Sequence, residues 1–270
     1  MMPALPDRVF VVTGASAGLG RAIAAALVAA GGKVVLAARG EESLLALAAE
    51  LGGPDKHVLA VPTDVTSDEH VAVLMNRAVE RFGRIDGLVN NVGVSMRSAL
   101  LDTSPDDFRH SLELNLLAAV RCTRAAAPHI IAQRGHIVNI GSLAGKSASR
   151  FLGAYPAAKH ALSAYTQQLR LELADQGVHV LLVCPGPIAR EQVRTYAAEQ
   201  QKNLPDSARR PGGGVRTKAI APDRLAEKIV AAIVRRQPEL IVPAKARLLF
   251  ALQQLSPSLG DWLVRKMTSK

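Results

Sequence analysis

The stretch Thr13-Gly14-Ala15-Ser16-Ala17-Gly18-Leu19-Gly20 decides the fold, because it joins a short apolar run to a segment of helical composition. The apolar run Val9 to Val12 precedes it as an expected strand, and Leu19 to Ala30 follows it as an expected helix. A second apolar run, Val34 to Ala37, comes directly afterwards. Glycine permits the tight turn that such a junction needs. The sequence therefore predicts a strand, helix, strand unit at the start of the chain.

The same alternation continues through most of the remaining chain. Further strands are expected at Val58 to Val61, Leu88 and Val89, Ile137 to Ile140, Val178 to Val183, and Leu240 to Val242. Helices are expected over about Asp68 to Phe82, Asp106 to Ile131, Ala154 to Ala174, and Pro222 to Arg235. Wholly apolar strands between amphipathic helices predict a parallel sheet buried on both faces. The expected fold class is α/β, a doubly wound parallel sheet in a single domain over residues 1–270, because no linker interrupts the rhythm.

Residues 189–219 stand outside this rhythm, since they are polar and rich in glycine. They follow a strand that should point into the ligand crevice of the sheet. A substrate lid and an ordinary surface loop are both open interpretations of this segment.

The C-terminal extension, residues 245–270, carries Leu248, Leu252, Leu255 and Leu259 at helical spacing, followed by Trp262. Pro257 is expected to divide it into two helices. Docking on the parent domain or on another subunit is the favoured interpretation of this apolar stripe. Peripheral contact with a membrane, with Arg247, Arg265 and Lys266 facing the headgroups, is the alternative.

The net charge of the chain is +10, and nearly all of the surplus lies in its last quarter. From Arg209 onward there are thirteen Lys and Arg residues against four Asp and Glu. Such a patch can attract nucleic acid or anionic lipid. No nucleic-acid-binding signature accompanies it, so a solvated surface is favoured and no nucleic-acid partner is expected.

Composition places the chain among ordinary globular proteins, with 49% hydrophobic and 21% charged residues. The two cysteines, Cys122 and Cys184, cannot form a disulfide framework. A secretory signal and an apolar span of membrane length are not evident. We therefore expect a cytoplasmic protein. The histidines show no metal-ligand spacing, and no metal is expected.

The glycine-rich turn also predicts a ligand. Backbone amides and the dipole at a helix N-terminus stabilise negative charge, and glycine lets the backbone approach a pyrophosphate closely. A glycine-rich run between a strand and a helix is the context in which this chemistry is expected. The sequence thus predicts a dinucleotide site at residues 13–20.

The spacing Thr-Gly-x-x-x-Gly-x-Gly resembles that of the short-chain dehydrogenase/reductase family. The resemblance extends along the chain through Asp64-Val65, Asn90-Asn91-Val92-Gly93, Ser142, Tyr155 with Lys159, and Pro185-Gly186. It implies a Rossmann fold, an NAD(P)-dependent enzyme that acts on CH-OH groups, and a homo-oligomer, either dimer or tetramer. The residues that it implies for cofactor binding are Gly14, Ser16, Gly18, Leu19, Gly20, Arg39, Asp64, Val65, Asn91, Gly93, Tyr155, Lys159, Pro185, Gly186 and Ile188.

Cofactor preference is expected to depend on the end of the second strand, where an acidic residue would repel a 2′-phosphate. The sequence there reads Ala37-Ala38-Arg39-Gly40, without an acid. Arg39 is placed to pair with the 2′-phosphate. We therefore predict NADP(H), with NAD(H) as the alternative.

Tyr155 and Lys159 lie four residues apart, which places both side chains on one face of a helix. A neighbouring ammonium lowers the pKa of a phenol and so helps it exchange a proton near neutral pH. By the resemblance, Lys159 also binds the nicotinamide ribose, Ser142 binds the reacting oxygen, and Asn115 anchors a water linked to Lys159. These four residues form the predicted catalytic set.

The predicted function is hydride transfer between nicotinamide and a carbonyl or secondary alcohol, with Tyr155 as general acid and base. Val94, Met96, Leu143, Phe151 and Leu152 suggest an apolar small-molecule substrate. Three positions depart from the family's pattern. Val92 stands where alanine is usual, Arg190 stands where a threonine often binds the carboxamide, and Pro156 requires a place in the first helical turn. The alternatives are an NAD-preferring dehydrogenase of the same fold, or a non-catalytic nucleotide-sensing protein with a basic C-terminal interaction surface.

Overall fold

A computed structural model describes residues 5–53, 57–189, 204–205, 208 and 218–268. Its centre is a seven-stranded parallel sheet with the order β3-β2-β1-β4-β5-β6-β7. The strands are β1 (Val9–Thr13), β2 (Lys33–Ala38), β3 (Val58–Pro62), β4 (Gly87–Asn90), β5 (His136–Ile140), β6 (His179–Pro185) and β7 (Glu239–Val242). The predicted doubly wound fold is confirmed.

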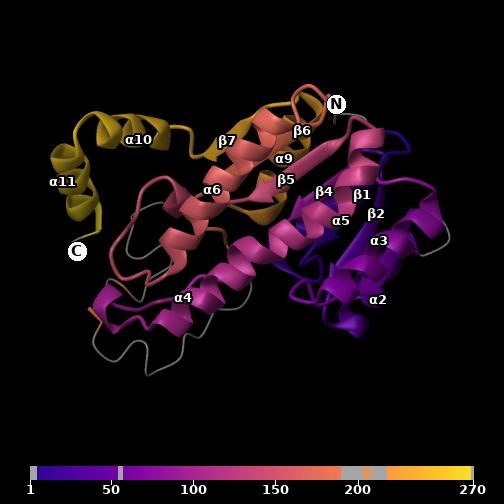
Figure 1. The fold of residues 1–270 in the computed structure, drawn as a ribbon, viewed down its shortest axis with the longest axis horizontal. Coiled ribbons are helices and arrows are strands. Elements are labelled where there is room, and N and C mark those ends of the chain that lie inside the picture. Colours follow the sequence, from indigo (N-terminus) through magenta and orange to yellow (C-terminus); the bar gives the residue numbers. More distant parts are fainter. Residues whose placement is uncertain (1–4, 54–56, 190–203, 206–207, 209–217, 269–270) are drawn as a thin grey trace.

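Helices cover both faces of this sheet (Figure 1). One face packs against α1 (Gly18–Ala29), α2 (Glu41–Glu50) and α9 (Pro222–Val234). The other packs against α3 (Asp68–Phe82), α5 (Ala118–Ala132) and α6 (Tyr155–Glu172). Strands β1, β4, β5 and β6 are buried along their whole length, because helices cover both faces of the sheet, as the sequence indicated.

The order of the strands reverses between β1 and β4, which lie side by side in the sheet. Ligands of open parallel sheets bind outside the carboxyl ends of the strands at such a switch point. Here these ends are Thr13 and Asn90. A ligand is therefore expected to bind at the loops that follow β1 and β4.

Two helical regions differ from the prediction. The single helix expected over Asp106 to Ile131 is divided into α4 (Pro105–Leu112), a π-helical turn over Glu113–Leu117, and α5. The pattern did not predict α2, although Leu44, Leu47 and Ala48 are its buried residues at helical spacing. Glu41 and Glu42 favour its start, since acidic residues stabilise a helix N-terminus.

The C-terminal extension forms two helices, α10 (Ala246–Leu255) and α11 (Pro257–Thr268), so the predicted break at Pro257 is confirmed. Figure 1 shows both helices at the left end, beyond β7. Of the predicted lid, all but a few residues lie outside the described part of the chain, and so does Arg190. Among the described helices, none has the length and apolar character needed to cross a membrane.

Candidate active site

The glycine turn after β1 has the backbone geometry that its sequence predicts. Gly14 and Gly18 adopt positive φ angles of 63° and 53°, a region that residues with a Cβ rarely enter. Gly20 has a different requirement, because a Cβ there would lie 2.1 Å from the carbonyl oxygen of Gly14. The turn can therefore close only with glycine at Gly20.

The N-terminus of α1 is suited to an anion. Its N-cap residue is Ala17, whose side chain makes no capping hydrogen bond, and its first turn contains no acidic residue. By contrast, Ser67 caps α3 and Ser104 caps α4. Beside it, the space around the Cβ position of Gly18 is open to 4 Å. The first amides of a helix need hydrogen-bond acceptors, so the N-terminus of α1 fits the diphosphate of a dinucleotide. Of the two other predicted residues in this turn, Ser16 is half-buried and Leu19 is buried in the core.

Asn91, predicted to contact the cofactor, lies at the glycine turn. Its Nδ2 donates hydrogen bonds to the carbonyl oxygens of Thr13 at 3.0 Å and Gly14 at 3.2 Å. Its backbone amide donates to Thr13 Oγ1 at 3.0 Å. These bonds join the ends of β1 and β4, so Asn91 fixes the shape of the turn.

Arg39 is exposed directly after β2, and Asp64 follows β3, the neighbouring strand. Thr66 donates hydrogen bonds to Asp64 Oδ1 from its backbone at 2.9 Å and from its hydroxyl at 2.8 Å. These bonds lower the pKa of Asp64, and the charge of Arg39 adds to the effect. Val65 is buried in the core. The two charged side chains thus lie at the same edge of the sheet.

Tyr155 and Lys159 occupy the first turns of α6 and are close in space. The Lys159 Nζ atom lies 5.9 Å from the centroid of the Tyr155 ring. Pro156 lies in the first turn, where a missing amide donor is tolerated. The helix therefore brings the predicted acid and its basic neighbour together, as their spacing indicated.

The ammonium group of Lys159 is buried, since the residue is only 3% exposed. Its Nζ donates a hydrogen bond of 2.8 Å to the carbonyl oxygen of Ile140, the last residue of β5. Burial lowers the pKa of Lys159 to about 8, because a low dielectric disfavours the charged form. A cation that can release its proton at a pH only slightly above neutral therefore lies beside the Tyr155 ring.

Ser142 and Asn115 complete the predicted set. Ser142 follows β5, and its Oγ accepts a hydrogen bond of 3.1 Å from the amide of Ala144. Asn115 lies within the π-helical turn and is buried. A Cβ on Gly93 would meet both Asn115 Oδ1 at 2.8 Å and Lys159 Nζ at 3.0 Å. Gly93 therefore leaves room for these two side chains to face the same point.

A buried chain of polar side chains beneath the site escaped the sequence analysis. Asn90 Nδ2 donates to Thr123 Oγ1 at 3.0 Å and to Asn139 Oδ1 at 2.8 Å. Asn139 Nδ2 in turn donates to Thr166 Oγ1 at 2.9 Å. These bonds connect β4, β5, α5 and α6 near the carboxyl edge of the sheet. The Asn90 side chain thus joins strands and helices beneath the site, whereas the side chain of its neighbour Asn91 stabilises the glycine turn.

The remaining predicted cofactor residues follow β6. Pro185 is its last residue, and the amide of Gly186 donates to the carbonyl oxygen of Val242 at 2.8 Å. Ile188 forms an isolated bridge with Ile220. These contacts hold the segment after β6 at the same edge of the sheet as the carboxyl end of β7.

Apolar side chains lie next to this edge. Leu143, the residue after Ser142, packs with Phe250 of α10 against Cys184. On the loop after β4, Met96 Sδ accepts a hydrogen bond of 3.3 Å from the amide of Ala154, directly before Tyr155. The helix α10 was not expected to contribute here, because its distance along the chain gave no signal.

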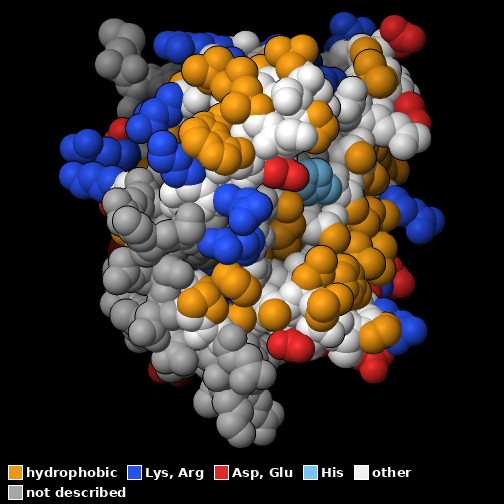
Figure 2. Space-filling view, turned by 90° about the vertical axis from the view of Figure 1, so that its left-hand side faces the viewer, with side chains coloured by type: hydrophobic (Ala, Val, Ile, Leu, Met, Phe, Trp, Pro, Cys, Tyr) orange, Lys and Arg blue, Asp and Glu red, His pale blue; other side chains and the backbone are white. Residues whose placement is uncertain are grey.

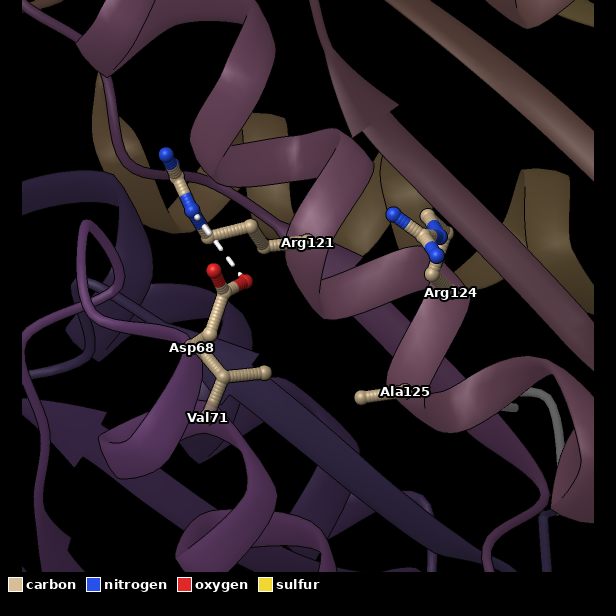
Figure 3. Close-up of a pocket in the computed structure, with 5 residues that line it drawn as sticks. All are labelled: Asp68, Val71, Arg121, Arg124 and Ala125. Atoms are coloured by element: carbon tan, nitrogen blue, oxygen red, sulfur yellow. Dashed lines mark ion pairs between the residues drawn. The ribbon is translucent and has the colours of Figure 1, made fainter.

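A separate hollow of about 420 Å³ lies between α3 and α5 (Figure 3). It is lined by Asp68, Val71, Arg121, Arg124 and Ala125, and Arg121 forms an ion pair of 3.4 Å with Asp68. None of the predicted site residues lines it. Elsewhere in the described residues, no group of three or more His, Cys, Asp or Glu is arranged to hold a metal ion.

A doubly wound parallel sheet with a glycine turn at its switch point defines a class of dinucleotide-binding proteins. The sequence model of the short chain dehydrogenase family matches residues 8–202 of this chain. The chain therefore belongs to this family and is an oxidoreductase.

Individual relatives agree with this assignment. A dehydrogenase/reductase SDR family protein 7-like of Drosophila melanogaster is 32% identical, over 98% of this chain and 82% of its own length. A Burkholderia phymatum short chain dehydrogenase/reductase in complex with NAD has a TM-score of 0.79 and 28% identity, covering 96% of both chains. L-sorbose reductase from Gluconobacter frateurii, complexed with NADPH and L-sorbose, has a TM-score of 0.76 and 26% identity over 89% of this chain and 97% of its own.

Proposed function

We propose that this chain is an NADP(H)-dependent oxidoreductase that transfers hydride between nicotinamide and a carbonyl or secondary alcohol, with Tyr155 as general acid and base. The observation that carries the proposal is the buried ammonium of Lys159, 5.9 Å from the Tyr155 ring and hydrogen-bonded to the end of β5. Burial of an ammonium costs free energy, so a position that retains it near a phenol indicates a chemical use.

The nicotinamide cofactor, when bound, supplies or accepts the hydride. Its diphosphate would lie at the uncapped N-terminus of α1, against the glycine turn of Gly14 to Gly20. Asp64 and Val65 would border the adenine, while Gly93, Pro185, Gly186 and Ile188 would border the nicotinamide half. All of these lie at the carboxyl edge of the sheet.

Tyr155 and Ser142 would both donate hydrogen bonds to a substrate carbonyl oxygen. As hydride reaches the carbon, the oxygen gains negative charge and takes the proton of Tyr155. The positive charge of Lys159 stabilises the phenolate that remains. Oxidation follows the same path in reverse, with Tyr155 as the base. Asn115 holds the loop that borders Lys159.

Two arguments support NADP(H) over NAD(H). Arg39 is exposed at the end of β2, where a guanidinium can make a bidentate contact with a 2′-phosphate. The β2 end also lacks the acid that would repel this phosphate. Similar structures hold NAD or NADPH, so the preference rests on Arg39 itself.

The substrate is proposed to be a small apolar carbonyl or alcohol. Leu143, next to Ser142, belongs to the same apolar cluster as Phe250, and Met96 contacts Ala154, the residue before Tyr155. Arg190 and the proposed lid lie outside the described residues and add nothing to this argument. The proposal keeps three expectations from the sequence analysis: the protein is a homo-oligomer, it is cytoplasmic, and the chain forms one domain.

Replacement of Tyr155 by Phe tests the proposal. Wild-type protein is first screened with NADPH against ketones, aldehydes, sterols and sugars. The Tyr155→Phe variant should bind NADPH with nearly unchanged affinity and lose about a hundredfold or more of the turnover. Tyr165→Phe, on the same helix, is the matched control and should keep it. Comparable turnover in Tyr155→Phe would refute the acid and base assignment, and NADPH binding without turnover of any substrate class would favour a nucleotide-sensing protein.

A further inference from the structure

The C-terminal hairpin, formed by α10 and α11, is only lightly packed against the sheet. Helix α10 contributes no buried residue. Its Ala246 and Phe250 pack against the ends of β6 and β7, and Arg247 donates a hydrogen bond of 3.4 Å to the carbonyl oxygen of Glu239. Five of the twelve exposed large hydrophobic side chains in the described chain belong to the hairpin, namely Leu248, Leu255, Leu259, Trp262 and Met267. The outer surface of the hairpin is therefore a candidate contact site, because exposed apolar side chains that gather on a surface often mark an interaction.

These side chains follow one face of each helix. Leu248 and Leu255 are two turns apart on α10, and they are 67% and 84% exposed. Leu259 and Trp262 are three residues apart on α11. The helices themselves are pressed together, since a Cβ on Gly260 would lie 2.6 Å from the Gln253 side chain. The hairpin thus presents a firm apolar stripe outward.

Basic side chains flank the stripe. The described hairpin and the residue before it carry Lys245, Arg247, Arg265 and Lys266, against the single acid Asp261. Lys266 Nζ lies 5.0 Å from the centre of the Trp262 ring, so a cation borders the largest apolar side chain. Figure 2, which looks onto this side of the molecule, shows hydrophobic side chains in its upper part with Lys and Arg side chains beside them.

We propose that the C-terminal hairpin binds the surface of a membrane that contains anionic phospholipid. Amphipathic helices with basic flanks and an apolar face of Leu and Trp lie in the membrane interface, with the apolar face among the acyl chains. A tryptophan favours this depth, because its ring is apolar and its N–H is polar. Lys245, Arg247 and Lys266 would contact the phosphate groups.

Charge favours lipid over a second copy of the chain as the occupant. In a twofold interface the same patch meets itself, so the net positive charge of two hairpins would be brought together. Charges closer than about 8 Å repel with little screening at physiological salt. An anionic surface neutralises the same charges instead.

The hairpin also adjoins the carboxyl edge of the sheet, where the proposed catalytic residue Ser142 lies. Phe250, on the inner side of α10, packs with Leu143 next to Ser142. A molecule held by its hairpin would therefore keep this edge near the membrane surface. The lipid proposal does not depend on the proposed catalysis, because binding is measured without substrate.

The fluorescence of Trp262 tests the proposal directly, since it is the only tryptophan in the chain. The full chain is titrated with vesicles of phosphatidylcholine alone and with vesicles that also contain phosphatidylserine. We expect a blue shift of the emission with the anionic vesicles, and co-sedimentation of the protein with them. High salt should weaken the association, because it screens the basic side chains.

Variants separate the two contributions. Leu255→Ser should weaken binding about tenfold or more, since a leucine is no longer buried in lipid. Lys245→Gln with Lys266→Gln should weaken it about twenty-fivefold, because each cation near an anionic surface contributes about a fivefold change. Leu45→Ser on α2, and Arg77→Gln with Lys228→Gln, are the matched controls and should bind as wild type. Unchanged circular dichroism confirms that each variant is folded.

Three results would overturn the proposal. The first is a Trp262 emission that no vesicle shifts. The second is equal binding by Leu255→Ser and wild type. The third is a wild-type oligomer that Leu255→Ser converts to a smaller species without any vesicle binding, since the hairpin would then cover a second copy of the chain.

Discussion

The Asn115 side chain forms two hydrogen bonds with the backbone of Val94. Its Oδ1 accepts from the Val94 amide at 3.1 Å, and its Nδ2 donates to the Val94 carbonyl oxygen at 3.0 Å. The same Nδ2 donates to the carbonyl oxygen of Ser111 at 2.9 Å. Asn115 lies in the π-helical turn between α4 and α5, a feature frequent at functional sites. The loop after β4 is thus tied to the helix that faces it.

Asn115→Ala should loosen this loop. Both backbone groups of Val94 lose their partner, which we expect to lower the free energy of unfolding by about 1–3 kcal/mol. Turnover should fall about ten- to a hundredfold, because the loop borders Lys159 and small displacements in a site are costly. Denaturant unfolding and kcat/KM with NADPH measure the two effects. Ser111→Ala is the control, because it keeps both hydrogen bonds between Asn115 and Val94. An unaltered kcat/KM in Asn115→Ala would show that Asn115 has no part in turnover.

Gly93→Ala should damage the site by crowding. The added methyl group would lie 2.8 Å from Asn115 Oδ1 and 3.0 Å from Lys159 Nζ, so one of these side chains must move. We expect turnover to fall at least about tenfold and unfolding to cost about 1–3 kcal/mol less. Steady-state kinetics and thermal unfolding report the change. Wild-type kinetics in this variant would show that the contact at Gly93 has no part in turnover.

Arg39→Asp should change the cofactor preference. The guanidinium that would pair with a 2′-phosphate is lost, and an acid that repels this phosphate and binds a ribose replaces it. Because hydrogen bonds between charged groups contribute about 1.5–3 kcal/mol, we expect NADPH affinity to fall about ten- to a hundredfold. NADPH and NADH are titrated side by side against wild type and the exposed control Arg77→Ala. Retained NADPH preference would mean that other residues select the cofactor.

The sequence predicted those parts of the site that are local along the chain. The glycine turn and the Tyr155–Lys159 pair each follow from a few residues, because turn geometry and helical spacing fix their relative positions. The fold class followed from the alternation of apolar strands with helices. The comparisons confirm both the fold class and the family.

Contacts between distant parts of the chain gave no such signal. The acceptor for Lys159 is a backbone carbonyl nineteen residues earlier, and the Asn115 side chain reaches Val94 across twenty-one residues. A carbonyl is the same in every residue, so the sequence does not mark it. The π-helical turn also escapes prediction, because its extra residue shifts a pattern read at 3.6 residues per turn.

Two histidines, for which the sequence shows no metal-ligand spacing, are buried at the amino ends of β5 and β6. His136 Nδ1 and His179 Nδ1 are 3.0 Å apart, and His179 Nε2 lies 2.7 Å from the carbonyl oxygen of Gln237. A carbonyl only accepts hydrogen bonds, so His179 Nε2 carries its proton and His136 Nδ1 donates to His179. The pair is satisfied when both rings are neutral.

Acid should therefore unfold the protein through this pair. Burial, and then the charge of His179, lowers the pKa of His136 from 6.5 to about 3, and burial lowers the pKa of His179 as well. Below pH 6.5 the unfolded chain binds protons that the folded chain does not, so the free energy of unfolding falls as pH falls from 6.5 towards 3. For His136 this difference contributes up to about 1.4 kcal/mol per pH unit, and His179 adds in the same direction. In His136→Asn the amide keeps a donor near His179 but does not titrate, and we expect a shallower pH dependence in denaturant unfolding at pH 7, 6 and 5. His110→Asn, an exposed substitution on α4, is the control, and an equally steep dependence in His136→Asn would assign acid sensitivity to other groups.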